Sequence, residues 1–329
     1  SFPKAHISSE NRDIYLKLSK DFLESHFNNM LAPICESRIP FLLDPRHKKS
    51  IIQISSYFLE FCRRASNEHS LSEDYYCHIY GAINVKFILD NIDYLHELIS
   101  EKNYPVILKL LPFFKESLLL VDSFEKSKIE QRANVAKNIL KQILHNKNVI
   151  LLIKRVIIVS KPLIKYFSRI CVDSIDILFK LIKNYSAKHK YWYVSSLSCA
   201  EVYSRENDSG SVDMSNSGHE SNFNFDSLIK HYATREIVEF YCQCLVNSEF
   251  EDKDFNSMLA RYYFHVIKSE YFFHSLMRPS LITQLQKIIT ASPSWMQNNN
   301  DLVVVAKKII RKFCNIVISD PSQLVMSFF

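Results

Sequence analysis

Aromatic and imidazole rings crowd the stretch LARYYFHVIKSEYFFHSLMRPSLI, residues Leu259 to Ile282. Side chains of these types could form an aromatic box around a cofactor, a catalytic histidine pair, or the buried seam between two helices. The spacing favours the seam, because the positions advance by three or four residues, as one face of a helix does. These positions are Tyr262, His265 with Val266, Ser269, and Phe272 or Phe273. Pro279 is expected to interrupt the run within a second helix that ends near Ile289.

Catalytic and metal-binding motifs are missing from the sequence. None of the histidines belongs to an H-E-x-x-H motif, and there is no G-x-S-x-G elbow, phosphate loop or kinase motif. The eight cysteines include no C-x-x-C pair, the spacing that zinc sites normally use. Scattered cysteines of this kind fill core positions in a reducing compartment. We therefore expect no catalytic residue, no metal site, no cofactor and no enzymatic activity.

Charge is distributed unevenly along the chain. Residues 131–192 hold 13 lysines and arginines against Asp173 and Asp176 alone, a net charge of +11, whereas residues 201–260 have a net charge of −8. A basic field of this density attracts polyanions over roughly 8–10 Å at physiological salt. Because phosphate contacts dominate nucleic-acid affinity, the basic middle predicts nucleic-acid binding. The alternative is a solvated helical surface without a partner.

Two groups of basic residues are candidates for this contact. Around Pro162, basic residues recur near helical spacing, which predicts a ridge that faces a DNA backbone. The alternative is that their long side chains lie along the apolar surface and only their charged ends reach solvent. The second group lies in KNYSAKHKYWY, residues Lys183 to Tyr193. Its cations could pair with phosphates while its aromatic rings stack on sugars or bases. The same segment is equally compatible with a helix end whose rings anchor the next element. The candidate DNA-binding residues are Lys154, Arg155, Lys161, Lys165, Arg169, Lys183, Lys188 and Lys190.

The elements that position these residues are predicted to be helices. Only 3 glycines occur in 329 residues, so the positive-φ positions of hairpins and phosphate loops are scarce. Apolar residues recur at helical spacing, and prolines fall near helix starts and breaks, which predicts an all-α chain of irregular helix pairs. The clearest stripes are Ile51, Ile54, Phe58 and Phe61 or Cys62; Val85, Ile88 or Leu89, Ile92 and Leu95; and Leu228, Ile229, Ile237, Phe240, Tyr241 and Leu245, with a break near 231–234.

Three regions are expected along the chain. A helical array covers residues 1–203 with the basic middle at 131–192, a flexible polar loop covers 204–226, and the array continues over 227–329. The loop is mostly Ser, Asn, Asp and Glu, which bury too little apolar surface to offset their ordering entropy. The most apolar run, VILLIKRVIIV, is shorter than a membrane span and carries Lys154 and Arg155. With no signal peptide at its start, we expect a soluble protein of the cytosol or nucleus.

The stretch RYYFHVIKSEYFFHSLMRPSLITQLQKII resembles the signature of the Timeless family of replication-fork proteins. In that family a helix with an R-[FY]-F-Y-R-V-A-F core precedes one of the type L-L-F-R-x-D-I-I. Matches to the first occur at Arg261, Tyr263, Phe264 and Val266. Matches to the second occur at Leu276, Arg278, Leu281 and Ile282, whereas Pro279 and Ser280 depart from the pattern.

Three further segments resemble family elements in the expected order. HFNNMLAPICESRIPF, from His26 to Phe41, is similar to the F-N-P-L segment, with Asn29 in place of the proline. IIQISSYFLEFCRRA is similar to the W-F-L-E-x-x-R-A helix, with Tyr57 in place of the tryptophan. The closing residues Asp301 to Phe329 resemble a helix followed by P-x-L-x-V-x-x-L-F. Family members are usually much longer, so we expect an internal portion or a divergent, compact member.

The resemblance implies an irregular, right-handed superhelical array of the armadillo or HEAT type. It implies a nuclear, non-enzymatic replisome scaffold: a fork protection complex subunit paired with a small Tipin-like partner. Such complexes travel with the replicative helicase and other replisome proteins, hold the parental double-stranded DNA without sequence preference, and relay stalled-fork signals to the checkpoint. No membrane contact is implied.

Two other interpretations remain open from the sequence. A helical adaptor in trafficking or transport would use the basic face to meet an acidic protein or lipid surface. An enzyme built on a helical scaffold would need histidine and glutamate side chains that converge in space without a recognisable motif.

Overall fold

The computed structural model describes residues 9–27, 29–31, 45–67, 85–126, 130–160, 163–188, 192–194, 221–246 and 252–319. These residues are almost entirely helical, and their helices pack against one another, so the predicted all-α class is confirmed. The chain divides into two compact units: residues 1–95 with 105–143, and residues 96–104 with 144–329. These are called the first and second units below.

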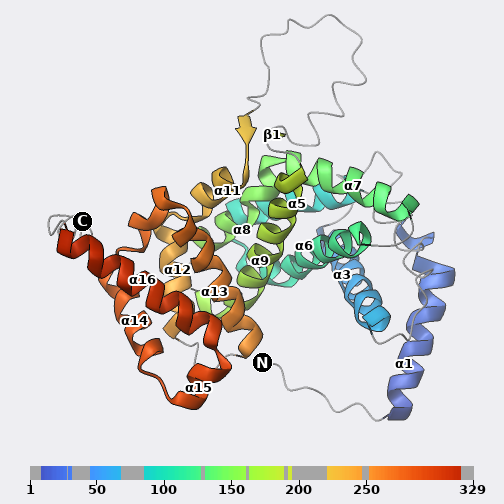
Figure 1. Cartoon of the computed structure of the whole chain (residues 1–329). Helices are drawn as coiled ribbons and strands as arrows, with labels where there is room; N and C mark the ends of the chain where they lie inside the picture. The colour runs from blue at the N-terminus through green and yellow to red at the C-terminus, as the bar shows by residue number, and fades with distance from the viewer. Residues whose placement is uncertain are drawn as a thin grey trace, which may run out of the picture. The chain divides into compact units, whose positions relative to one another are not determined.

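The elements follow one another along the chain, and Figure 1 labels the α-helices and β1. They are α1 (Ser9–Phe22), a π-helical turn η1 (Leu23–Phe27), α3 (Pro45–Asn67), α5 (Val85–Ser100), α6 (Tyr104–Glu125), α7 (Glu130–His145), α8 (Lys147–Val159), α9 (Ile164–Lys188), β1 (Trp192–Val194), β2 (Ser221–Phe223), α11 (Phe225–Tyr232), α12 (Arg235–Val246), α13 (Lys253–Lys268), a 3-10 helix η4 (Glu270–Leu276), α14 (Pro279–Ile289), α15 (Pro293–Asn298) and α16 (Asn300–Ser319).

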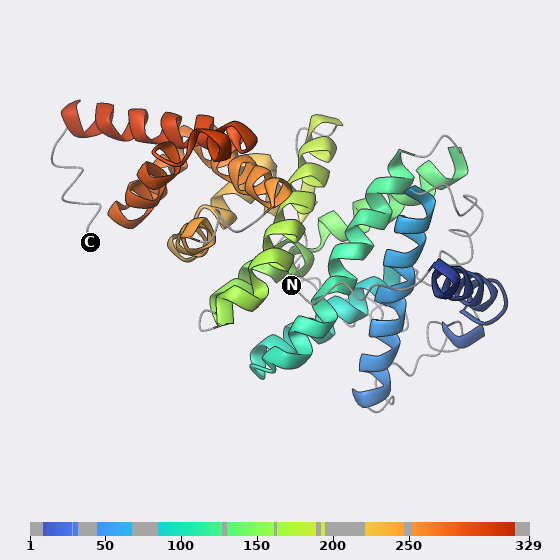
Figure 2. The same cartoon turned by 90° about the horizontal axis from the view of Figure 1, so that it is seen from below.

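Aromatic contacts hold the first unit together. The ring of Phe58 in α3 stacks on Phe22 of α1 with centroids 5.0 Å apart and meets Phe27 of η1 edge-on at 5.2 Å. Phe87 of α5 meets Phe113 of α6 edge-on at 5.7 Å. Such ring pairs add about 0.5–1.5 kcal/mol beyond the area they bury. Figure 2 shows α3 in mid-blue among the blue and green helices of this unit.

The apolar stripe predicted for α3 is only partly correct. Ile54 is 37% exposed, whereas Ile52, Leu59 and Cys62 are buried together with Phe58. Ser55 is also fully buried. The buried face is therefore turned slightly from the predicted one, because it includes a small hydroxyl side chain that an apolar count leaves out.

Tyrosines connect the helices of the second unit. The Tyr232 hydroxyl of α11 donates to the Ile150 carbonyl of α8 at 2.6 Å, and the Tyr262 hydroxyl of α13 donates to the Tyr232 carbonyl at 2.9 Å. The ring of Tyr241 in α12 stacks on Tyr262 with centroids 3.5 Å apart. Tyr232 and Tyr262 are buried, so each of their hydroxyls needs the partner that it has. α13, in orange in Figure 1, packs against α9 and α16.

The ring-rich stretch forms a buried seam, as its spacing predicted. Tyr262, Val266 and Phe273 are buried, whereas His265 and Ser269 are half-buried, and the buried Tyr263 was not among the predicted positions. The predicted position of Pro279 is wrong: α13 ends at Lys268, η4 follows, and Pro279 begins α14 rather than interrupting it. Proline is well suited to a first helical position, where its missing N–H is not needed and its φ is already helical.

Most of the predicted polar loop, residues 204–220, lies outside the described residues. From Ser221 onward the chain forms β2, which pairs antiparallel with β1 so that Phe223 lies opposite Trp192 and Ser221 opposite Val194. Asn224 then caps α11 by accepting a hydrogen bond from the Ser227 N–H at 2.8 Å. The helical continuation therefore begins at Phe225, and its break falls at residues 233–234, inside the predicted interval.

Candidate polyanion-binding surface of helices α8 and α9

Helix α8 presents cations on the face that it does not bury. It begins after Asn146, whose side chain accepts a hydrogen bond from the Asn148 N–H at 2.8 Å, a standard helix start. Its apolar side chains are largely buried against neighbouring helices. The polar face carries Lys147, Lys154 and Arg155, and no carboxylate occurs in the helix.

Three lysines from two helices gather around His231 of α11. Burial lowers the pKa of His231, and the ammonium groups of Lys154, Lys147 and Lys230 lower it further. Lys154 is itself half-buried, and burial lowers its pKa while Glu236 of α12 opposes that change. The sequence indicated only Lys154 of these three. Lys147 belongs to the basic middle, but Lys230 lies in the acidic stretch, where net charge gave no signal for it.

Arg155 is exposed and hydrogen-bonded to a histidine. Its guanidinium Nη1 lies 3.1 Å from His96 Nδ1, and His96 Nε2 lies 3.0 Å from the Asn148 carbonyl oxygen. Burial lowers the pKa of His96 to about 4, with Arg155 adding to this effect and the Asn148 hydrogen bond opposing it. The imidazole is therefore neutral at pH 7. Since Arg155 can only donate, Nδ1 accepts and the proton sits on Nε2, which donates to Asn148.

Helix α9 carries a stripe of charges rather than a continuous basic ridge. The stripe advances by three or four residues: Lys165, Arg169, Asp173, Asp176, Lys180 and Lys183. Its two carboxylates lie in the middle and divide the lysines into two ends. Lys165 and Lys183 are 18 positions apart, which is about 27 Å along a helix.

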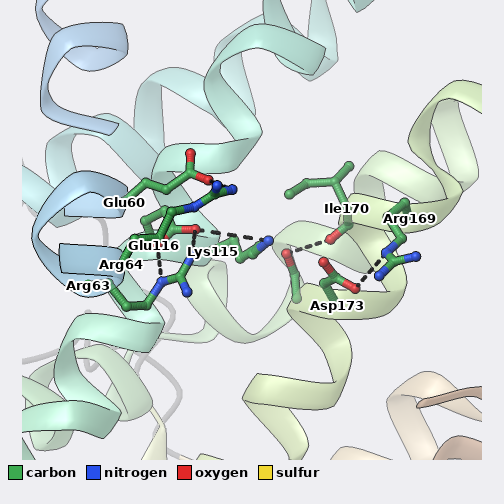
Figure 3. A network of polar contacts seen from close by, with 9 residues as sticks. Glu60, Arg63, Arg64, Lys115, Glu116, Arg169, Ile170 and Asp173 are labelled. Atoms are coloured by element: carbon green, nitrogen blue, oxygen red, sulfur yellow. Dashed lines mark hydrogen bonds and ion pairs between the residues drawn. The ribbon is translucent and has the colours of Figure 1, made fainter. Parts of the chain in front are cut away.

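Arg169 connects α9 to the start of α13. Its Nη1 donates to Asp252 Oδ2 at 2.8 Å, its Nε lies 3.5 Å from Asp173 Oδ1, and its guanidinium lies 5.3 Å from the Phe255 ring centroid (Figure 3 shows the Asp173 contact). A guanidinium engaged on three sides is poorly placed to take a phosphate as well. The structure thus gives this candidate an internal partner, which the sequence did not predict.

Arg261 makes the second connection between α9 and α13. Its Nε and Nη2 donate to the two oxygens of Asp176 at 2.6 and 2.8 Å, the two-pronged geometry that favours arginine over lysine. The Asp176 hydrogen bond is the main reason that the pKa of Arg261 is raised. Both carboxylates of the α9 stripe are therefore balanced by arginines, and the lysines at its two ends set the sign of the field there.

The remaining candidates are exposed or lie outside the described residues. Lys165 is exposed, with its ammonium 5.0 Å from the centroid of the exposed Tyr166 ring. Lys183 and Lys188 are exposed on the last turns of α9. Lys161 and Lys190 fall outside the described residues. The candidates thus do not line one groove: Lys154 belongs to the lysine group around His231, Arg155 to the His96 contact, and Arg169 to the α13 connection.

No family model and no curated protein matches this sequence. Among the described residues, no three His, Cys, Asp or Glu side chains gather as metal ligands would.

The Arg169–Asp252 contact makes a testable contribution to stability. Burial raises the pKa of Asp252, but the Arg169 hydrogen bond and the Phe255 and Asp254 N–H groups outweigh this, and the net pKa is lowered. A lowered folded-state pKa means that the ionised carboxylate stabilises the fold above its ordinary pKa of 3.8, and that this stabilisation is lost as the pH falls through the folded value.

We expect Asp252→Asn to keep the helix cap, since asparagine caps as well as aspartate, and to lose only the charge. The loss at pH 7 should be under about 1 kcal/mol, because the pair is exposed. Chemical unfolding of both proteins between pH 7 and pH 2 measures this. The two curves should converge at the acidic end, and a constant difference across the range would contradict the assignment.

Proposed function

We propose that this chain is a nucleic-acid-associated helical scaffold of the Timeless type, a part of a replication fork protection complex. In this role it holds double-stranded DNA without reading its sequence. The observation that supports the proposal best is the gathering of Lys147, Lys154 and Lys230 around His231, together with the absence of carboxylates from α8. Like charges collected on one surface cost stability, and contact with an anionic partner offsets that cost.

The chemistry of this surface suits a phosphate backbone better than base edges. Lysine ammonium groups are compact point charges that neutralise phosphates from many directions. Base readout uses side chains that offer paired donors or acceptors, such as arginine and glutamine. Arg155 and Arg169 already have internal contacts. Binding through lysines alone would therefore be strong at low salt and independent of sequence.

The segments that resemble Timeless elements occur in the expected order along the chain, which supports the Timeless assignment. The signature residues that the structure describes have structural positions. Tyr263, Val266, Leu276 and Leu281 are buried, and Arg261 joins α13 to α9. Proteins that share a fold need similar residues in its core, so burial of these signature residues is what membership of the family requires. The proposal extends to a right-handed armadillo or HEAT-like superhelix, a nuclear location, a Tipin-like partner, the replicative helicase and checkpoint signalling. None of the described helices is both long and apolar enough to cross a membrane.

Anisotropy of labelled duplexes of about 30 base pairs, in two unrelated sequences, tests the DNA contact across a sodium chloride titration. We expect equal affinity for both sequences. Lys147→Glu/Lys230→Glu should lower the log–log salt slope by about 2, since about 0.9 is lost per phosphate contact. The variant Lys165→Glu/Lys183→Glu tests in the same way whether the lysines at the two ends of the α9 stripe contact phosphates.

The matched control is Lys17→Glu/Lys109→Glu, which changes the net charge equally at two exposed lysines of the first unit. A control that weakens binding as much as the α8–α11 variant would mean that overall charge, and not this surface, attracts DNA. Absence of duplex binding at about 50 mM salt would remove DNA from the proposal. Binding to anionic vesicles in its place would favour the adaptor interpretation.

A further inference from the structure

The last part of the described chain carries a second basic surface. From Tyr271 to Ser319 there are six lysines and arginines and a single carboxylate, Asp301. Four of these cations lie close together on α16: Lys307, Lys308, Arg311 and Lys312. Lys307, Lys308 and Arg311 are exposed, while the opposite face of the helix buries Leu302, Val305, Ala306 and Ile309, among others. The three exposed cations thus share the solvent face over about one turn, whereas Lys312 is half-buried, with its ammonium 4.5 Å from the ring centroid of the buried Phe273.

Helix α13 extends this surface beside α16. Ser257 donates to Asp301 at 3.2 Å near the start of both helices, and Phe264 lies under the Lys308 ammonium further along, at 5.6 Å from the ring centroid. The two helices therefore run parallel, with α16 in red and α13 in orange in Figure 1. Lys268 follows Phe264 by one turn on α13 and is also exposed. It adds a fifth cation at the same end.

Phe264 is the unusual member of this surface. Its ring is 41% exposed, whereas its neighbours Tyr262 and Tyr263 are buried. Most of the rings in this stretch fill the core, so an exposed phenylalanine beside cations is not explained by packing. His265, next to it, packs edge-on against Phe179 and Phe225 with centroids 5.8 and 5.2 Å apart. A layer of packed rings therefore lies beside the exposed one, with Phe179 buried and His265 and Phe225 half-buried.

The fold alone does not account for the cations either. The helix dipole favours cations in the last turn, but α16 continues to Ser319, beyond Arg311 and Lys312, and its last turn carries no basic residue. The one carboxylate of α16, Asp301, lies at the opposite end from them. Charges of one sign at this density repel one another unless an anionic partner is present.

We propose that the exposed face of α13 and α16, made by Phe264, Lys268, Lys307, Lys308 and Arg311, binds single-stranded nucleic acid. The cations contact successive phosphates, and a base stacks on the Phe264 ring. A duplex keeps its bases stacked inside and gives an exposed ring nothing to stack on, so the combination selects an unpaired strand. This site does not rest on the α8–α11 surface, and either can fail without the other.

The probes are labelled strands of about 20 nucleotides, oligo-dT and oligo-U, with the labelled duplex for comparison, all with the full chain at about 50 mM salt. We expect the single strands to bind, and Lys307→Glu/Lys308→Glu/Arg311→Glu to lower the log–log salt slope by about 2. Phe264→Ala should weaken single-strand binding about 5- to 100-fold, the range for one lost stacking contact, and leave the salt slope unchanged. Phe264→Trp should restore or increase the affinity. The oligo-dT and oligo-U arms separate a DNA partner from an RNA partner.

Photocrosslinking gives a readout that a loss of folding would not imitate. A strand containing 5-iodouracil should crosslink to the peptide that contains Phe264 in the unchanged protein. Lys17→Glu/Lys109→Glu/Lys137→Glu is the charge-matched control, since these three lysines are exposed in the first unit. The proposal would be overturned if the control variant lost as much single-strand affinity as the α16 variant. Crosslinks only at other peptides, or an unchanged affinity in Phe264→Ala, would overturn it as well. Binding of an acidic peptide with no binding of either strand would overturn it in favour of a protein partner.

Discussion

Arg63→Met should destabilise the first unit by about 3 kcal/mol, because it leaves a buried carboxylate without its counter-ion. Arg63 of α3 donates from Nε and Nη2 to the two oxygens of Glu116 in α6, at 2.8 and 3.1 Å (Figure 3). The Glu116 side chain is only 3% exposed. The remaining cation, Lys115, lies 3.9 Å away and is too distant to replace a two-pronged contact.

The neighbouring arginine provides the control. Arg64 pairs with Glu60 one turn earlier on the same helix, and both side chains are substantially exposed. Arg64→Met should therefore change the stability by less than about 1 kcal/mol. Arg63→Met/Glu116→Met should recover most of the loss, since an apolar pair of similar volume often replaces a buried ion pair without cost. A double variant as unstable as Arg63→Met would mean that packing, and not the charge, causes the effect.

The measurement has to report on the first unit alone. Both tryptophans, Trp192 and Trp295, belong to the second unit, so tryptophan fluorescence follows the wrong part of the chain. Hydrogen exchange of peptides from α3 and α6, followed by mass spectrometry in increasing denaturant, reports on the two helices that the ion pair joins. Peptides from α13 and α16 should exchange at unchanged rates in the Arg63 variants.

Local periodicity was enough to predict most of the helices. The stripe of Ile88, Leu89, Ile92 and Leu95 is buried in α5, as its spacing indicated. Periodicity failed where the buried face includes a polar residue, as at Ser55 in α3, because spacing counts only apolar side chains. It also failed at Pro279, since a proline marks either a break or a first turn and the sequence does not say which.

The candidate site was harder to predict because its partners are distant in sequence. Arg169 and Asp252 are 83 positions apart, and Arg261 and Asp176 are 85 positions apart. A net charge summed over a stretch of sequence counts these four residues separately, as two basic and two acidic positions. In the fold they form two ion pairs, and their charges largely cancel. The same averaging hid Lys230, which lies in an acidic stretch but acts on His231 together with two lysines of α8. Only the fold brings them together.

The basic surface of α16 shows the opposite limitation. Its cations are visible in the sequence, but the pattern from Tyr271 onward predicts only a continuation of the helical array, and the basic middle has the denser charge. What makes α16 informative is the combination of Lys308 and the exposed Phe264, which are 44 positions apart and lie on different helices. The predicted spacing left both Phe264 and its neighbour Tyr263 out of the seam, although Tyr263 is buried, so spacing alone did not separate the exposed ring from the buried one.

Tyr262→Ala should destabilise the second unit by about 4 kcal/mol, the usual cost of removing a large ring from a core. The residue is 2% exposed, its ring stacks on Tyr241 at 3.5 Å with an interplanar angle of 7°, and its hydroxyl donates to the Tyr232 carbonyl. Tyr262→Phe keeps the ring and leaves one carbonyl with one partner fewer, so it should cost only about 1 kcal/mol.

Phe264→Ala is the matched control, because it removes a ring of similar size two positions further along the same helix. Phe264 is 41% exposed, so its loss should cost under about 1.5 kcal/mol. Denaturant unfolding followed by the fluorescence of Trp192 and Trp295, which both lie in the same unit, compares the three variants. Equal losses for Tyr262→Ala and Phe264→Ala would contradict the division of this stretch into a buried seam and one exposed ring. A large loss for Tyr262→Ala alone would leave Phe264 free for a role outside the core.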